Sequence, residues 1–158
     1  MALTVAAPVG GRTHALADVP DPVFQQQLLG PGISLMPTVT AERTTVASPV
    51  GGQISSVRHH AIVVDAGNGI HVLTHLGVDT FKAGEQLFQL HVHAGQKVTV
   101  GQPLVEWDLK ETRKLDLEPW VTVTVLGTDP ATPVNVERLA DVNKTVTTGQ
   151  ALLAVTSG

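Results

Sequence analysis

Two histidines near the middle of the chain, His60 and His75, have the residue type and the spacing to perform chemistry together. They flank a stretch that is typical of a β-hairpin, with aliphatic and β-branched runs on either side of Ala66-Gly67-Asn68-Gly69. A two-residue loop at Gly67-Asn68 or at Asn68-Gly69 would bring the two imidazoles together on one face, directly or diagonally opposite. A three-residue loop would put them on opposite faces, because side chains alternate along a strand.

Two imidazoles on one face suit two kinds of chemistry. In a phosphoryl relay, a neutral imidazole nitrogen attacks phosphorus and a second imidazole donates N–H to the phosphoryl oxygens. In a metal site, both rings are ligands. Two ordinary half-buried polar side chains remain the simplest alternative to either chemistry.

The composition limits the kinds of protein that this chain can be. Its 158 residues, 42% of them hydrophobic, are enough for one domain over 1–158 with a core of its own. Aromatic residues make up only 3% and the net charge is −4, so neither nucleic acid nor an anionic membrane surface is expected as a partner. The chain has no cysteine, which excludes a disulfide scaffold and a thiolate metal site. With no signal peptide or apolar span recognisable, a cytoplasmic location is expected.

Short runs of Val, Ile, Leu and Thr, separated by Gly and Pro, predict an all-β sandwich or barrel. Helical pattern is confined to two short turns, at Pro22–Leu28 after a capping Asp21 and at Lys110–Leu115. Two internal echoes indicate a pair of interleaved β half-units closing one core. In these echoes 7–11 (APVGG) returns as 48–52 (SPVGG), and 97–105 (KVTVGQPLV) returns as 145–153 (TVTTGQALL).

Several motifs, taken together and in order, resemble the glucose-family enzyme IIA (EIIA) component of the bacterial sugar phosphotransferase system over nearly the whole chain. They are APVGG (7–11), DVPDPVF (18–24), GPGI (30–33), SPVGG (48–52), HHAIVV (59–64), VLTHLGVDT (72–80) and GQKVTVGQPLVEWDL (95–109).

The resemblance implies an antiparallel β-sandwich of the duplicated hybrid kind and a phosphotransferase activity without a cofactor. His75 would accept a phosphoryl group from the carrier protein HPr, and His60 would stabilise it. The phosphoryl group would pass to the IIB domain of a glucose, N-acetylglucosamine or β-glucoside type permease, the only route by which the chain would associate with a membrane. The residues expected to meet these partners are Asp21 and Asp79 as charges and Val23, Phe24, Leu73 and Phe81 as apolar contacts.

The sequence departs from the family pattern near the two histidines. Arg58 stands where the family usually has a hydroxyl residue, and it could add a charge-assisted hydrogen bond to the phosphoryl group. Thr74 replaces the usual aliphatic residue before the phosphorylated histidine, and Glu85-Gln86-Leu87 replaces a glycine pair before Phe88.

A zinc metallohydrolase of the duplicated hybrid type is the alternative interpretation. It would use His75 and Asp79 as an HxxxD element and take His93 from the His91-Val92-His93 element. The two elements are much closer together here than in such peptidases. Because two imidazoles supply only two ligands, any zinc bound at His60 and His75 is expected to be incidental or bridging rather than catalytic.

Overall fold

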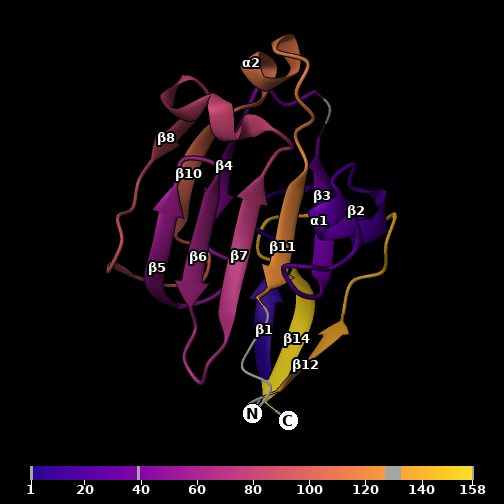
Figure 1. Ribbon diagram of the computed structural model, residues 1–158, viewed down its shortest axis with the longest axis vertical. Coiled ribbons are helices and arrows are strands. Elements are labelled where there is room, and N and C mark those ends of the chain that lie inside the picture. The colour runs from indigo at the N-terminus through magenta and orange to yellow at the C-terminus, as the bar shows by residue number, and fades with distance from the viewer. Residues whose placement is uncertain (1, 39, 127–132, 158) are drawn as a thin grey trace.

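The computed structural model describes residues 2–38, 40–126 and 133–157, and over these residues the fold consists almost entirely of β-strands (Figure 1). The strands are β1 (Ala2–Ala6), β2 (Gly11–His14), β3 (Gly32–Pro37), β4 (Arg43–Ala47), β5 (Gly52–Arg58), β6 (Ala61–Asp65), β7 (His71–Leu76), β8 (Phe88–Leu90), β9 (Lys97–Val98), β10 (Pro103–Asp108), β11 (Val121–Val125), β12 (Val134–Arg138), β13 (Thr145–Val146) and β14 (Ala151–Ser157). The helical elements are η1 (Leu16–Asp18), α1 (Pro22–Gln25), η2 (Thr80–Lys82), η3 (Gly84–Gln86) and α2 (Leu109–Lys114).

The strands of the described residues form one large sheet and two small ones. The eight-stranded sheet has the order β13-β2-β3-β11-β7-β6-β5-β9, and the three-stranded sheets have the orders β1-β14-β12 and β4-β10-β8. Figure 1 shows β5, β6, β7, β11 and β3 side by side across the large sheet, with β1 and β14 together at one end. The main core draws on all three sheets, and every pairing between the strands is antiparallel. The predicted all-β antiparallel sandwich is confirmed.

The two halves of the chain are interleaved through the echoed motifs. The Ala6 amide donates to the Pro49 carbonyl at 2.9 Å, and the Ala47 amide donates to the Pro8 carbonyl at 2.8 Å. The first early motif pairs with the second late motif, through β2 and β13, and the second early motif pairs with the first late motif, through β5 and β9. Each half-unit therefore completes the hydrogen bonding of the other, as the echoes predict.

The last glycine of each early motif is required by a close approach between strands. A Cβ at Gly11 would lie 2.3 Å from the Met36 carbonyl oxygen, and a Cβ at Gly52 would lie 2.1 Å from the Asp65 carbonyl oxygen. Both contacts are with backbone atoms of a paired strand, which cannot move aside without breaking the ladder. The same close approach between strands thus explains why both half-units have glycine at this position.

The two short α-helices begin close to where the sequence predicts them. The Asp21 carboxylate accepts a hydrogen bond from the Val23 amide at 3.0 Å, which caps α1, although this helix ends at Gln25 rather than Leu28. The Asp108 carboxylate caps α2 through the Glu111 amide at 2.9 Å. In the part of the chain that the structure describes, no helix has the length and apolar character needed to cross a membrane.

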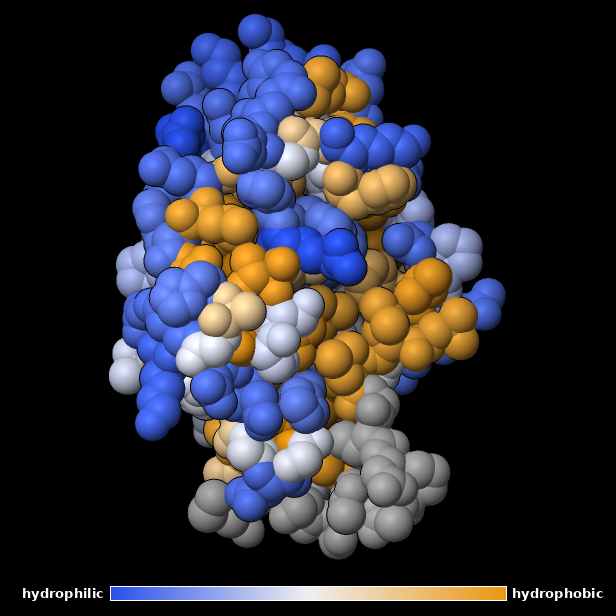
Figure 2. Space-filling model, turned by 60° about the vertical axis from the view of Figure 1, so that its left-hand side comes forward, coloured by the Kyte–Doolittle hydropathy of each residue, from blue (hydrophilic) through white to orange (hydrophobic). Residues whose placement is uncertain are grey.

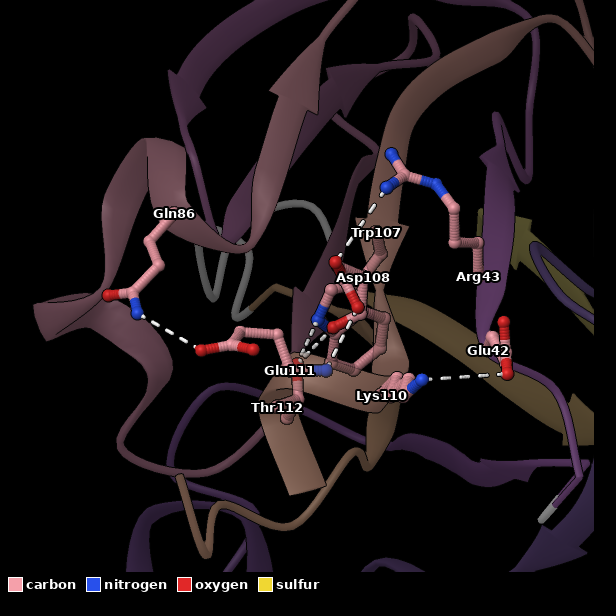
Figure 3. A network of polar contacts seen from close by, with 8 residues as sticks. All are labelled: Glu42, Arg43, Gln86, Trp107, Asp108, Lys110, Glu111 and Thr112. Carbon is pink, nitrogen blue, oxygen red and sulfur yellow. Dashed lines mark hydrogen bonds and ion pairs between the residues drawn. The ribbon is translucent and has the colours of Figure 1, made fainter. Parts of the chain in front are cut away.

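A polar network holds α2 against the ends of β10 and β4 (Figure 3). The indole of buried Trp107 donates to the Thr112 hydroxyl at 2.9 Å, and that hydroxyl lies 2.7 Å from the Asp108 carbonyl oxygen, to which it donates. Arg43 on β4 lies 3.7 Å from the Asp108 carboxylate. The helix therefore closes one end of the sandwich by side-chain hydrogen bonds as well as by its cap.

We expect Gly11→Ala and Gly52→Ala each to lower the free energy of unfolding by about 2 kcal/mol, because the added methyl group overlaps backbone of the paired strand. Gly10→Ala and Gly51→Ala are the matched controls, with the nearest atom at an ordinary 3.6 Å and 3.7 Å, and should change it by about 0.5 kcal/mol or less. Urea unfolding of the four variants measures the difference. Equal effects at both positions of a motif would contradict the account.

Candidate functional site

His75 lies near the end of β7, on the outer face of the large sheet. It pairs with Ala61 of β6 on one side and with Thr122 of β11 on the other. Its neighbours in the strand, Thr74 and Leu76, are almost fully buried at 1% exposure each and point to the opposite face of the sheet. His75 is therefore held by a central strand and faces away from the main core.

The hairpin has the three-residue loop, and neither of the two-residue loops that would bring the two imidazoles together within the ladder. The Ala66 amide donates to the Ile70 carbonyl at 2.9 Å, which leaves a three-residue loop with φ values of 87° at Gly67, 54° at Asn68 and 77° at Gly69. Three successive residues that tolerate positive φ allow this longer loop as readily as a two-residue turn. With this register His75 faces Ala61 rather than His60.

His60 nevertheless meets His75, because it lies in a turn and not in the strand. His59 and His60 connect Arg58, the last residue of β5, to Ala61, the first residue of β6. The His60 carbonyl accepts a hydrogen bond from the Leu76 amide at 2.7 Å, which ties the turn to the end of β7. The two imidazole centroids are 5.2 Å apart with an interplanar angle of 83°. Side chains alternate between the two faces only within a strand, and His60 lies outside β6. The two imidazoles are therefore close because of the turn and not because of the register of the hairpin.

Beneath His75 lies a second, smaller hydrophobic cluster. Its buried members are Val19, Phe24, Leu73 and Trp120. The Phe24 ring packs edge-on against the His75 ring, with centroids 5.0 Å apart. These side chains bury one side of the imidazole and fix its position.

The four apolar residues expected to contact a partner divide into two pairs. Phe24 and Leu73 are only 2% and 7% exposed, so they offer little area to another protein in this structure, and their contact with a partner stays a prediction. They lie within the cluster under His75 because α1 folds over this face of the sheet. Val23 at 37% and Phe81 at 59% are exposed, and the Phe81 ring centroid lies 6.3 Å from that of His60.

The two predicted acidic residues have different local roles. Asp21 caps α1 and lies near enough to His75 to act on its charge. Asp79 is exposed and has a left-handed backbone, with φ of 60°, just before η2. A conformation of this kind is common for Asp and Asn among non-glycine residues.

Burial lowers the pKa of His75 to about 4, and the neighbouring His60 acts in the same direction. The charge of Asp21 and a backbone contact at Gly77 oppose this shift. The pKa of His60 is also lowered, first by burial and then by the charges of Arg58 and His59. At neutral pH the His75 ring is therefore uncharged and carries a nitrogen lone pair.

The two ring nitrogens of His75 are not equivalent. Nδ1 is buried and makes no hydrogen bond of good geometry within the described residues. The ring as a whole is only partly buried, so its accessible nitrogen is Nε2. An electrophile approaching from solvent can reach only that atom.

The remaining histidines do not extend the pair into a metal centre. His91, which directly follows β8, lies 3.4 Å from Glu106 on β10, and the Nδ1 atom of His93 lies 3.0 Å from the Ala94 carbonyl oxygen. Among residues 2–38, 40–126 and 133–157, no three His, Cys, Asp or Glu side chains are grouped so that they could hold a metal ion. The arrangement therefore gives no support to the zinc hydrolase that uses His75, Asp79 and His93.

Sequence reasoning missed two residues of the site. Trp120 is 8% exposed and forms part of the cluster under His75, and its ring packs edge-on against that of His14 at a centroid distance of 5.0 Å. Thr122 lies beside His75 on β11 at 1% exposure. The two lie some 45 residues further along the chain, and only the pairing of β11 with β7 connects them to His75. A tryptophan in a chain with so few aromatic residues was the one available signal.

Comparisons with known proteins agree on one family. Residues 3–130 match the family described as phosphoenolpyruvate-dependent sugar phosphotransferase system, EIIA 1. The glucose-specific EIIA component of Bacillus cereus is 35% identical over 130 residues, covering 81% of this chain and 76% of the relative. That of Staphylococcus aureus is 32% identical over 136 residues, covering 85% and 80%. Among solved structures, the glucose permease IIA from Mycoplasma capricolum superposes with a TM-score of 0.80 at 25% identity, covering 98% of this chain and 96% of that one.

Replacing His75 with Gln should make stability less dependent on pH between 6.5 and 4. In this window the unfolded state binds a proton at His75, whose pKa there is about 6.5, whereas the folded state does not, since its pKa is lowered to about 4. The free energy of unfolding of the wild type therefore falls as the pH is lowered through this window. Above pH 6.5 neither state is protonated, and this contribution is absent.

Urea unfolding at several pH values between 7.5 and 4 measures the slope for wild type and His75→Gln. His93→Gln, at an exposed histidine, is the matched control. The slope is reduced rather than removed, because His60 contributes in the same direction. Identical slopes for wild type and His75→Gln would contradict the burial argument.

Proposed function

The chain belongs to the EIIA type 1 family of the phosphoenolpyruvate-dependent sugar phosphotransferase system, and we propose that His75 is the residue on which it carries the phosphoryl group. As a member of this family it is a phosphotransferase component that carries phosphoryl groups in sugar uptake. It interacts with HPr and with the IIB domain of a permease. The residues that perform these steps, and one functional domain over 1–158, are our proposal.

The observation that carries this assignment is a neutral imidazole with one accessible nitrogen. Burial keeps the His75 ring uncharged at neutral pH, and buried Nδ1 leaves Nε2 to react. A lone pair on Nε2 requires the proton of the neutral ring to reside on Nδ1, which is the tautomer a nucleophile needs.

In the transfer from phospho-HPr, the Nε2 lone pair forms the new P–N bond while the bond between phosphorus and the donor breaks. The electron pair of the broken bond stays on the donor atom, so no proton has to move between the two proteins. The second transfer reverses these roles, with Nε2 as the leaving atom and the IIB nucleophile as the acceptor.

His60 is the residue proposed to stabilise the phosphoryl group on His75. Its ring centroid lies 5.2 Å from that of His75, and its backbone is tied to the end of β7, so it needs no rearrangement to donate an N–H. A donor held in place before the reaction stabilises the charge that develops on the phosphoryl oxygens in the transition state.

The surface around the two histidines suits transient docking. Apolar side chains interrupt a largely polar surface on the side of the molecule drawn in Figure 2. Exposed apolar side chains near the site are those of Val23 on α1 and Phe81 on η2. Asp21 and Asp79 add negative charge at the same elements, which would steer a basic partner toward His75.

The proposal also includes a permease type and a location. Relatives named as glucose-specific favour a glucose-type IIB domain over the N-acetylglucosamine and β-glucoside types. The location proposed is the cytoplasm, where phosphoenolpyruvate supplies the phosphoryl group, and contact with the membrane would occur only through the permease.

Substituting His75 with Gln should abolish phosphorylation, since Gln has no nitrogen lone pair that can attack phosphorus. Incubation of the protein with enzyme I, HPr and radiolabelled phosphoenolpyruvate measures the label, which should be acid-labile and base-stable. His60→Gln retains the nucleophile and should still be labelled, but should pass the phosphoryl group to IIB roughly 10²-fold more slowly.

Full labelling of His75→Gln would refute the assignment of the nucleophile. An unchanged rate of transfer to IIB from His60→Gln would refute the role of His60 and leave that of His75 standing.

Neutralising the two acids, as Asp21→Asn with Asp79→Asn, should slow phosphorylation by HPr about tenfold at low ionic strength and flatten its dependence on salt. Rim charges act on association, and their field is screened over about 8 Å at physiological ionic strength. Asn is suited to both positions, because it can cap α1 and tolerates a left-handed backbone.

The measurement is the initial rate of phosphorylation against salt concentration. Glu137→Gln with Asp141→Asn removes the same net charge from exposed positions on or just after β12 and is the matched control. If the two double variants give the same curve, the acids at the site have no special part in docking.

A further inference from the structure

Arg58 lies in the same row of paired residues as His75. It pairs with Ala61 across the β5–β6 hairpin, and Ala61 pairs with His75 across β6 and β7. Residues directly opposite in a ladder project to the same face, so the three side chains share the outer face of the sheet. Adjacent strands are about 4.8 Å apart, which places the Arg58 and His75 backbones about 10 Å from each other.

The residue between Arg58 and His75 in this row has a small side chain. Ala61 carries only a methyl group, which packs against the cluster under His75. An arginine side chain is long enough to extend over such a residue toward the histidine. Arg58 also lines a cavity of about 310 Å³ together with His60 and Phe81, so its side chain borders space next to the second histidine.

The guanidinium of Arg58 has no competing partner in the described part of the chain. It forms neither an ion pair nor a side-chain hydrogen bond there, and it is exposed. The nearby cation Lys82 behaves differently, since its Nζ lies 5.5 Å above the centre of the Phe81 ring. The charge of Arg58 is felt at His60, where it contributes to the lowered pKa. A free guanidinium thus stands at the edge of the two-histidine site.

We propose that Arg58 binds the phosphoryl group on His75 and stabilises the phosphorylated form of the protein. This inference rests on the proposed function, since it takes His75 as the phosphorylated residue. A phosphoryl group on Nε2 presents anionic oxygens above Ala61, between Arg58 and the two rings. A guanidinium recognises such oxygens through charge-assisted, bidentate hydrogen bonds.

The equilibrium of phosphoryl transfer distinguishes a residue that stabilises the phosphorylated form from a residue that only assists docking. If Arg58 only assisted the encounter with HPr, its removal would change the forward and reverse transfer rates by the same factor. The equilibrium between phospho-HPr and the phosphorylated chain would then stay where it is. Binding of the phosphoryl group by Arg58 instead shifts that equilibrium toward the phosphorylated chain.

The test is the equilibrium constant for phosphoryl exchange between HPr and the full chain, measured from both directions. Arg58→Gln should shift it toward phospho-HPr by about tenfold, the size of effect expected for charge-assisted hydrogen bonds at an exposed site. Arg58→Lys keeps the charge but not the planar fork and should give a smaller shift. Arg138→Gln, at an exposed position on β12 in a different sheet, removes the same charge and should leave the equilibrium unchanged.

A second readout needs no phosphorylation. In the unmodified protein, Arg58→Gln should raise the pKa of His60 in an NMR titration, because one of the charges that lower it is gone. An equilibrium in Arg58→Gln equal to that of the wild type would overturn this inference, with His75 still phosphorylated in both. A wild type that takes no phosphoryl group on His75 would overturn the proposed function, and this inference with it.

Discussion

The register of β7 within the large sheet is the constraint on which the site depends. Pairing of His75 with Ala61 and Thr122 sends its ring to the outer face, and sends Thr74 and Leu76 into the core. A shift of one residue would exchange these faces, putting an imidazole in the apolar interior and a leucine at the surface. Because β7 is flanked on both sides by paired strands, such a shift would have to break two ladders at once.

The chemistry proposed for the two histidines follows from that register. On the outer face His75 packs against Phe24 over a small cluster that excludes water from one side of the ring. The burial that keeps the ring neutral is the same burial that blocks Nδ1. His60 completes the pair from a turn whose carbonyl is hydrogen-bonded to the end of β7. The position of the His75 ring, its neutral state and the accessibility of its Nε2 atom therefore have one structural origin.

The sequence predicts the elements better than their relative positions. The strands, the Asp21 cap and the interleaved half-units depend on local patterns or on repeated motifs, and these are readable from one chain. The loop of Gly67-Asn68-Gly69 is not, because residues that tolerate positive φ permit turns of either length. The burial of Phe24 and the place of Trp120 depend on contacts between distant segments, which no local pattern encodes. The resemblance to a family, rather than the hairpin argument, gave the right reason to expect His60 close to His75.

The central claim is that burial leaves only Nε2 of His75 free to carry the phosphoryl group. NMR of protein labelled with ¹⁵N at histidine and phosphorylated through HPr tests it directly, since coupling between phosphorus and a ring nitrogen identifies the bonded atom. The account predicts coupling to Nε2 of His75, with Nδ1 of the same ring protonated. Coupling to Nδ1 of His75, or to a nitrogen of any other histidine, would contradict it.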